Sequence, residues 1–323
     1  MGTVPGSARG ADVPETPDGP TAWPADRDAL LAVVAEVVGS GRDARWLVEA
    51  AEQAASGGAG AGGFETGSGG RDRAATVRAL ALRRAAGEPL QYVLGRWPFR
   101  TLELAVDART LIPRPETEQV VEVALAEWGR LLAERTADRP VCVDLGTGSG
   151  AIALSMAVEG ARAATEFEVW ATDDSPAALE VAGENLGELA RLRPGAAARV
   201  RLRRGSWFDA LPGELTGRVD LVISNPPYVS EEEFCDLDPE VREWEPAAAL
   251  RAGRGSAGVG GMAAIERIVS GAPRWLSPRG GIVVEIAPHQ AYAAIDLARR
   301  AGFPRVATER DLAGRLRMLV ASR

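Results

Sequence analysis

The stretch Val141-Cys142-Val143-Asp144-Leu145-Gly146-Thr147-Gly148-Ser149-Gly150 decides the fold of this 323-residue chain. A run of apolar residues leads into a glycine-rich loop and then a helical pattern, the strand-loop-helix order of α/β proteins. Further apolar runs alternate with helical segments, at Glu168–Thr172, Val200–Leu202, Val219–Ser224 and Gly281–Ile286, and two more strands are predicted within Phe303–Ala321. The sequence therefore predicts an α/β fold: a doubly wound, mostly parallel seven-stranded sheet that binds ligands at the carboxyl ends of its strands.

The chain divides by composition into four parts. Residues 1–25 are rich in Gly, Pro and Ala without periodicity, which predicts a disordered tail. Residues 26–110 predict a smaller N-terminal helical domain, with a glycine-rich insertion at 56–70 and a hairpin at 92–111. A linker and helix follow at 111–137, and the domain built on the sheet takes 138–323.

Capping residues place some of the helix starts. Apolar residues recur at helical spacing over residues 26–55, where Asp43 can cap the second of two helices. Leu111–Glu118 contains two prolines and predicts an extended entry into the next helix, which Glu116 or Thr117 can cap.

Composition excludes several classes of protein. The formal net charge of -8 argues against broad attraction to nucleic acid. Cys142 and Cys235 are the only cysteines, so neither a disulfide framework nor a metal site is indicated. No apolar stretch is long enough for a membrane helix, and no secretory leader is recognisable. We expect a soluble, cytoplasmic protein.

A nucleoside cofactor is indicated by the glycine loop and the strand after it. The loop, Gly146–Gly150, has the pattern G-x-G-x-G, whereas dinucleotide-binding loops favour the wider G-x-G-x-x-G that admits a pyrophosphate. Asp173 ends the next strand, where its carboxylate can accept both hydroxyl hydrogens of a ribose. S-adenosylmethionine fits, because it has no pyrophosphate and its positive charge would lie near Asp144. The alternatives are a loop chosen only for tight packing, and Asp173 and Asp174 as a solvated helix start.

Two aromatic residues, Trp207 and Phe208, follow the third strand of the sheet. We predict that Trp207 stacks on adenine, since stacking of a base on an aromatic side chain is worth about 1–3 kcal/mol. The alternative, that the rings fill the core, is at least as good for Phe208.

The motif Asn225-Pro226-Pro227-Tyr228 directly follows the strand Val219–Ser224. Two prolines are hard to place inside a parallel sheet but fit just past the end of a strand. The Asn225 side-chain oxygen and the Pro226 carbonyl can accept the two hydrogens of a planar NH2 group, which aims its lone pair at a methyl carbon, while Tyr228 packs on the planar group. The predicted chemistry is methyl transfer to a planar nitrogen by positioning and electrostatics, without a strong base. A plain turn is the alternative.

Together these motifs resemble the bacterial peptide chain release factor glutamine methyltransferase family. The resemblance extends from about Asp43 to the C-terminus and rests on Glu88–Tyr92, Leu94-Gly95, Leu111–Glu118, Asp144–Gly150, Asn225–Tyr228, Glu245-Pro246 and Asp311–Arg315. It implies a class I methyltransferase sheet that uses S-adenosylmethionine, yields S-adenosylhomocysteine and needs no metal. It also implies transfer to the side-chain amide nitrogen of the glutamine in the Gly-Gly-Gln motif of class 1 release factors.

The resemblance also implies residue roles. The cofactor would contact Gly146, Thr147, Gly148, Ser149, Gly150, Asp173, Trp207 and Asn225. The catalytic residues would be Asn225, Pro226 and Tyr228, and the substrate glutamine would lie against Asn225, Pro226, Pro227 and Tyr228. The N-terminal helical domain would recognise the release factor, and the enzyme would act as a monomer.

Two segments depart from the family's pattern. An Asp-Gly-Gly turn is common in the family, where this sequence has Arg251–Gly255, and a common Glu-Ile-Gly is here Glu285-Ile286-Ala287-Pro288-His289. His289 is the only histidine, and since the predicted chemistry needs none, we expect a surface residue.

The same motifs are compatible with three further functions. An adenine-N6 DNA methyltransferase would offer its base's exocyclic amine to the same pocket. Residues 231–245 contain eight acidic residues and one arginine, which would repel phosphates and favour a basic protein surface, unless they form only a solvated face. A glutamine methyltransferase of a large-subunit ribosomal protein and a cofactor-binding module without catalysis complete the set.

Overall fold

The computed structural model describes residues 23–56, 69–133, 139–164, 166–256 and 258–323. The chain forms two compact units, Met1–Gly87 and Glu88–Arg323. This division precedes the hairpin, which therefore belongs to the C-terminal unit, whereas composition placed the boundary near residue 110. Residues 1–22 of the predicted tail and 57–68 of the predicted insertion lie outside the described residues.

The N-terminal unit consists of α1 (Arg27–Val38), α2 (Gly41–Ala55) and α3 (Gly69–Ala85). Ser40, and not Asp43, caps α2, because the Ser40 hydroxyl oxygen accepts from the Asp43 backbone N–H at 3.2 Å. The Asp43 carboxylate instead accepts a hydrogen bond from Arg84 Nε at 2.9 Å. The helices bury the apolar side chains Leu30, Val34, Leu47, Val48 and Val77.

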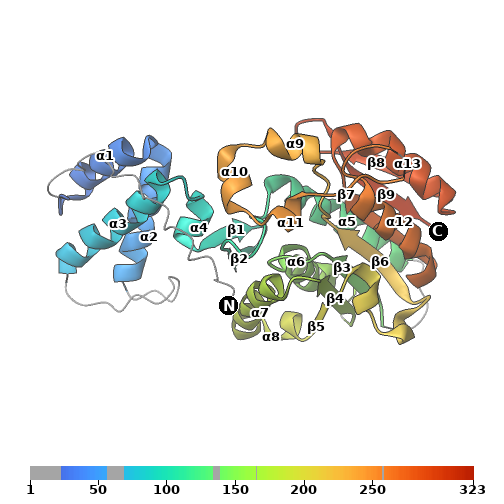
Figure 1. Cartoon of the computed structure of the whole chain (residues 1–323). Helices are drawn as coiled ribbons and strands as arrows, with labels where there is room; N and C mark the ends of the chain where they lie inside the picture. Colours follow the sequence, from blue (N-terminus) through green and yellow to red (C-terminus); the bar gives the residue numbers. More distant parts are fainter. Residues whose placement is uncertain (1–22, 57–68, 134–138, 165, 257) are drawn as a thin grey trace, which may run out of the picture. The chain divides into compact units, whose positions relative to one another are not determined.

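The C-terminal unit contains the seven-stranded sheet, in the order β5-β4-β3-β6-β7-β9-β8 (Figure 1). Its parallel strands are β3 (Val141–Leu145), β4 (Glu168–Asp173), β5 (Val200–Arg204), β6 (Val219–Ser224) and β7 (Leu276–Glu285). β8 (Arg305–Arg310) and β9 (Leu316–Ser322) pair antiparallel at one side. This confirms the doubly wound, mostly parallel sheet that the apolar runs predict.

Helices cover both faces of the sheet. One core combines α5 (Pro115–Ala133), α6 (Ala151–Glu159) and short α8 (Pro194–Ala197) with Cys142, while Val141, Val143 and Leu145 of the same strand pack against α12 (Ala263–Trp275) and α13 (Ala291–Arg300) on the other side. Alternate residues of a strand point to opposite faces, so a continuous apolar run is needed to serve both.

The remaining elements are short except for α7 (Pro176–Leu192). They are α4 (Leu90–Leu94), α9 (Glu231–Cys235), α10 (Pro239–Trp244), α11 (Ala247–Leu250) and the 3-10 turns η1 (Gly160–Arg162), η2 (Trp207–Ala210), η3 (Gly213–Leu215) and η4 (Pro288–Gln290). Within the described ranges, no helix combines the length and the apolar character needed to cross a membrane.

The hairpin predicted at 92–111 is present over a shorter range, with the strands β1 (Arg96–Phe99) and β2 (Leu102–Ala105). Arg100 lies in its turn, with a φ of 52°. Its Nε and Nη2 atoms donate to the Glu159 carboxylate of α6 at 2.7 and 2.8 Å, and its Nη1 donates to the carbonyl of Glu118 in α5 at 2.9 Å. The Arg100 guanidinium holds the pKa of Glu159 below its usual range. The hairpin is thereby fastened to two helices of the unit.

We expect the Arg100→Ala variant to lose about 3–5 kcal/mol of unfolding free energy, because it leaves the buried Glu159 carboxylate without its partner. Urea unfolding at neutral pH measures this loss. Arg130→Ala is the matched control: its i,i+3 partner Glu127 lies on the same helix, and we expect a change within about 0.5 kcal/mol. If the two variants lost equal unfolding free energy, the proposed contribution of the Arg100–Glu159 ion pair to stability would be contradicted.

Candidate active site

A cavity of about 260 Å³ opens in the C-terminal unit at the carboxyl ends of β3, β4 and β6. β3 has β4 on one side and β6 on the other, so this is the point where the strand order reverses, and open α/β sheets bind ligands there. The lining residues fall within the segments 109–117, 146–152, 173–178, 205–207, 225–227 and 246–249.

The glycine loop presents bare backbone to the cavity. Gly146 and Gly148 have φ values of 72° and 56°, in the left-handed region that favours glycine. The N–H groups of Gly146 and Thr147 donate to the Thr172 carbonyl at 2.9 and 2.8 Å, which ties the loop to β4. A Cβ at Gly148 would meet no protein atom within 4 Å. Gly150 is not among the lining residues, and a Cβ there would meet the Leu154 side chain at 3.2 Å.

Asp144 lies buried beneath this loop. Its Oδ2 accepts from Thr147 Oγ1 at 2.6 Å and from the Ala153 N–H at 3.1 Å. Its Oδ1 is buried without a hydrogen-bond partner among the described residues. Burial raises the pKa of Asp144 to about 7. Asp144 is not among the residues that line the cavity, so it could act on a ligand there only through its charge. A positive charge in the cavity would compensate the burial of this carboxylate.

Asp173 reaches the cavity from the end of β4. Its Oδ2 accepts from the Gly148 N–H at 2.9 Å and its Oδ1 from the Ser175 N–H at 3.0 Å. Each carboxylate oxygen has a further lone pair that can accept a ligand hydroxyl. Ser175 caps α7, with its hydroxyl accepting from the Ala178 N–H at 3.2 Å. Asp173 thus contributes to the helix start through the Ser175 N–H, and its remaining lone pairs are still available at the cavity.

The two aromatic residues lie in different environments, as the sequence predicts. Trp207 lines the cavity, and its ring lies 3.5 Å from the position that a Cβ on Gly146 would take. Phe208 is buried and stacks on Trp275, with ring centroids 6.0 Å apart. Only Trp207 is therefore placed to contact a ligand.

The Asn225–Tyr228 motif is divided between the cavity and the layer behind it. Asn225 and Pro227 line the cavity, whereas Pro226 is buried, and neither Pro226 nor Tyr228 is among the lining residues. Asn225 Nδ2 donates to Thr117 Oγ1 at 3.0 Å. The Tyr228 hydroxyl donates to Glu285 Oε1 at 3.1 Å. The packing of Tyr228 on a substrate stays a prediction.

The sequence does not predict a role for Glu285, and the prediction that Thr117 caps a helix is wrong. Thr117 was expected to cap a helix, but α5 already begins at Pro115, so Thr117 lies inside its first turn and lines the cavity. Its hydroxyl donates to Glu285 Oε2 at 2.9 Å. Burial raises the pKa of Glu285 to about 7. The available signal was a carboxylate at the carboxyl end of an apolar strand, the same signal that identified Asp173.

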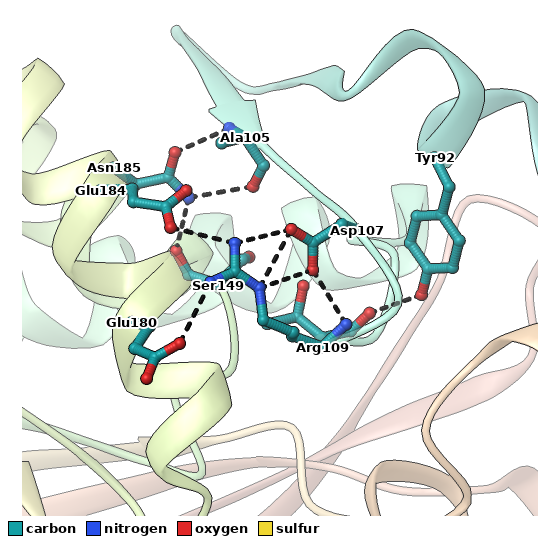
Figure 2. A network of polar contacts seen from close by, with 9 residues as sticks. Tyr92, Ala105, Asp107, Arg109, Ser149, Glu180, Glu184 and Asn185 are labelled. Carbon is teal, nitrogen blue, oxygen red and sulfur yellow. Dashed lines mark hydrogen bonds and ion pairs between the residues drawn. The ribbon is translucent and has the colours of Figure 1, made fainter. Parts of the chain in front are cut away.

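A network of polar contacts fastens the segment 106–113 beside the cavity (Figure 2). Asn185 of α7 accepts from the Ala105 N–H at 2.7 Å and donates to the carbonyls of Ala105 and Ser149 at 3.1 and 2.9 Å. Arg109 pairs with Asp107 on its own segment and with Glu180 and Glu184 of α7.

Thr110, on the same segment, contributes a second polar atom without a partner. The Tyr92 hydroxyl donates to the Thr110 carbonyl at 2.6 Å and so fixes the backbone there. The Thr110 hydroxyl is buried without a hydrogen-bond partner in the described chain, and Thr110 lines the cavity. A ligand's polar group could therefore satisfy it.

The cavity is also lined by α11 and the residue before it, through Pro246, Ala248 and Ala249. Glu245 is buried and accepts from the Ile112 N–H at 3.1 Å and from Arg114, so it is not part of an acidic surface as the sequence suggested. In the segment Arg251–Gly255, where the sequence departs from the family's pattern, Arg251 pairs with Glu231 and Arg254 pairs with Glu232.

His289 is half-exposed and faces Glu233, with Nδ1 and Oε1 3.6 Å apart. It does not line the cavity. This agrees with its expected place on the surface.

Replacement of Glu285 by glutamine should change the pH dependence of stability. The folded state holds a proton on Glu285 up to about pH 7, whereas the unfolded chain releases it near pH 4.5. Its contribution is therefore fully present at low pH and is lost as the pH rises to about 7. We expect the unfolding free energy of Glu285→Gln, relative to the unsubstituted protein, to rise by roughly 3 kcal/mol across this window. Urea unfolding at several pH values measures the difference, and a difference independent of pH would contradict the assignment.

Comparisons with known proteins agree with this geometry. The Methyltransferase small domain family matches residues 129–237. A release factor glutamine methyltransferase of Bordetella pertussis is 45% identical over 240 residues, covering 74% of this chain and 80% of that relative. Relatives of the same name from Cereibacter sphaeroides and Bifidobacterium longum are each 40% identical, and they cover 77% and 76% of this chain and 80% of their own lengths.

A solved structure of similar sequence is a release factor-specific protein-(glutamine-N5) methyltransferase from Alicyclobacillus acidocaldarius. It is 28% identical, covers 66% of this chain and 94% of that chain, and has a TM-score of 0.36. On the strength of the sequence relatives, the chain belongs to the release factor glutamine methyltransferase family and is a methyltransferase.

Proposed function

We propose that this methyltransferase uses S-adenosylmethionine to methylate the side-chain amide nitrogen of the glutamine in the Gly-Gly-Gln motif of class 1 peptide chain release factors. The names of its relatives support the reaction class. The single observation that carries the proposal is Asn225, whose side-chain oxygen is available at the cavity because its nitrogen is bonded to Thr117.

The residues of the cavity fit the cofactor. When bound, S-adenosylmethionine supplies a methyl group on a positively charged sulfur. Asp144, with one buried oxygen lacking a partner among the described residues, suits that positive charge, and Asp173 can accept the ribose hydroxyls. Trp207 offers a ring face for adenine. We assign the cofactor contacts to the expected residues that line the cavity, namely Gly146, Thr147, Gly148, Ser149, Asp173, Trp207 and Asn225. Gly150 instead packs against Leu154. S-adenosylhomocysteine is the expected product.

The chemistry asked of the protein is orientation of an amide. An amide nitrogen delocalises its lone pair into the carbonyl and is a weak nucleophile until its hydrogens are held out of the way. Asn225 Oδ1 and the Pro226 carbonyl are the proposed acceptors, with Pro227 and Tyr228 shaping the site. Methylation makes the nitrogen acidic, so its proton can leave afterwards to water, and no strong base is required.

A protein substrate is favoured over DNA by charge. α9 begins with Glu231, Glu232 and Glu233, all exposed, and Asp236 and Asp238 follow. Arg251 and Arg254 pair with Glu231 and Glu232, but the five exposed carboxylates outnumber these two arginines. A surface with an excess of negative charge attracts basic protein and repels phosphate. We further propose that the enzyme acts as a cytoplasmic monomer, and that the N-terminal helices take part in recognising the release factor.

One assay separates the candidate functions. Purified class 1 release factor, large-subunit ribosomal protein and duplex DNA are each incubated with enzyme and S-adenosylmethionine and analysed by mass spectrometry. We expect one added methyl group, on the Gly-Gly-Gln glutamine, and none after that glutamine is replaced by alanine. Methylation of the ribosomal protein or of adenine, with the release factor unmodified, would overturn the proposal.

Asn225→Ala should abolish transfer while weakening cofactor binding only moderately. It removes an acceptor that matters most in the transition state, and the loss of one such group costs about 10²–10³-fold in kcat. Single-turnover methylation and calorimetric titration with S-adenosylhomocysteine give the two quantities. Leu192→Ala, an exposed substitution on α7, is the control. Unchanged turnover in Asn225→Ala would exclude the proposed role.

Asp173→Ala should instead act on cofactor affinity. Hydrogen bonds to a charged acceptor are worth about 1.5–3 kcal/mol each, so we expect a loss of affinity of at least about tenfold. Asp296→Ala removes the same charge from an exposed position on α13 that does not line the cavity, and it should change the affinity much less. Calorimetry with S-adenosylhomocysteine measures both, and equal losses would contradict the assignment of the ribose to Asp173.

A further inference from the structure

We propose that Glu285 and Thr117 are positioning residues that determine which end of the Asn225 amide faces the cavity. This relay, Glu285–Thr117–Asn225, rests on the proposed function, because it explains how Asn225 is kept as a hydrogen-bond acceptor. It also assigns to the site a selectivity for a carboxamide over a carboxylate.

The relay begins at a buried acceptor. Glu285 ends β7 and is 1% exposed. Its two oxygens accept from the hydroxyls of Thr117 and Tyr228, at 2.9 and 3.1 Å. Burial raises the pKa of Glu285 to about 7, and above that pH the ionised carboxylate has no hydrogen to donate, so both hydroxyl hydrogens then point toward Glu285.

The direction of the Thr117 hydroxyl then fixes the next bond. A threonine hydroxyl has one hydrogen, and Thr117 uses it on Glu285. Toward Asn225 it can therefore offer only a lone pair, and Asn225 Nδ2 donates to it at 3.0 Å. If the Asn225 amide turned over, its oxygen would face the Thr117 oxygen with no hydrogen between them. The amide is thereby held with its nitrogen toward Thr117.

As a consequence, the Asn225 amide presents a hydrogen-bond acceptor to the cavity. Asn225 lines the cavity, and with its nitrogen toward Thr117 the amide oxygen is the end left to meet a substrate. The NH2 group of a glutamine has only hydrogens to offer, so it is complementary to that oxygen. A glutamate carboxylate has only acceptors and would face acceptor against acceptor.

The groups around the relay come from separate elements. Thr117 and Glu116 belong to the first turn of α5, Tyr228 follows β6, and Glu285 ends β7. Arg317 of β9 is the nearby cation whose charge favours the ionised form of Glu285, while Glu116 acts in the opposite sense. Burial outweighs Arg317 and raises the pKa of Glu285 to about 7, so the acceptor state prevails above that pH, and the kinetic test of the relay is made there.

The test compares variants at both ends of the Thr117–Asn225 bond. Thr117→Val keeps the shape of the side chain and removes the hydroxyl, Thr117→Ala removes it at smaller volume, and Thr117→Ser keeps it. Asn225→Ala and the double variant Thr117→Val/Asn225→Ala complete a double-mutant cycle. For each protein, kcat and KM are measured with a release-factor fragment containing Gly-Gly-Gln, together with the affinity for S-adenosylhomocysteine and the melting temperature.

We expect Thr117→Val and Thr117→Ala to lower kcat by about 10- to 100-fold, since they release a preorganised acceptor, while cofactor affinity stays within about threefold. Thr117→Ser should recover most of the lost rate. The double variant should be no slower than Asn225→Ala within about twofold, because Thr117 acts through Asn225. If wild-type kcat persists in both hydroxyl-free variants, or if the two losses multiply, the relay is wrong.

A second readout addresses selectivity directly. The same fragment carrying Gly-Gly-Glu is used as a competitive inhibitor. The measured quantity is the affinity for the Gly-Gly-Glu fragment divided by the affinity for the Gly-Gly-Gln fragment. We expect this ratio to be about tenfold higher in Thr117→Val than in the unsubstituted protein, because the freed Asn225 amide can turn its NH2 toward a carboxylate. Unchanged relative inhibition would overturn the relay. Failure of the unsubstituted enzyme to methylate the Gly-Gly-Gln fragment would instead overturn the proposed function, so the two failures are distinguishable.

Discussion

The parallel pairing of β3 with β6 is the constraint on which the site depends. The register places Asp144 beside Ile223, so the glycine loop and Asn225 leave the sheet at adjacent positions. The Ser224 hydroxyl donates to the Leu145 carbonyl at 2.6 Å and fixes the two strand ends to each other. Every residue proposed to hold cofactor or substrate is positioned relative to this pair. A slip of one residue would move the side chains of either strand to the opposite face.

Carboxylates dominate the chemistry that surrounds the cavity. Asp144, Asp173 and Glu285 each lie at or near the carboxyl end of a strand, and burial raises the pKa of all three. Burying a carboxylate destabilises the fold unless hydrogen bonds compensate, and here neighbouring hydroxyl and backbone donors supply them. Asp173 is the one of the three that lines the cavity, whereas Asp144 lies beneath the glycine loop and Glu285 binds Thr117 and Tyr228.

The sequence predicted the sheet and the principal motifs because both are local signals. Apolar runs identify strands, and glycine or proline directly after a strand identifies the loops at its end. The sequence did not predict the roles of Thr117, Glu285 and Asn185, because these roles arise from contacts between elements distant in the chain. The acidic run predicts a surface charge at Glu245 for the same reason, since its partner Arg114 belongs to another segment. Asp43 shows a finer limit: a capping residue and a residue of the first turn look alike in sequence when Ser40 also precedes the helix.

Asn185 joins two backbones that the sequence separates, the end of the hairpin at Ala105 and the glycine loop at Ser149. Both are bonded to this one side chain of α7, so a motion that displaces Asn185 releases the two segments together. Local opening of the two segments should then be a single cooperative event, with one free energy governing the hydrogen exchange of both.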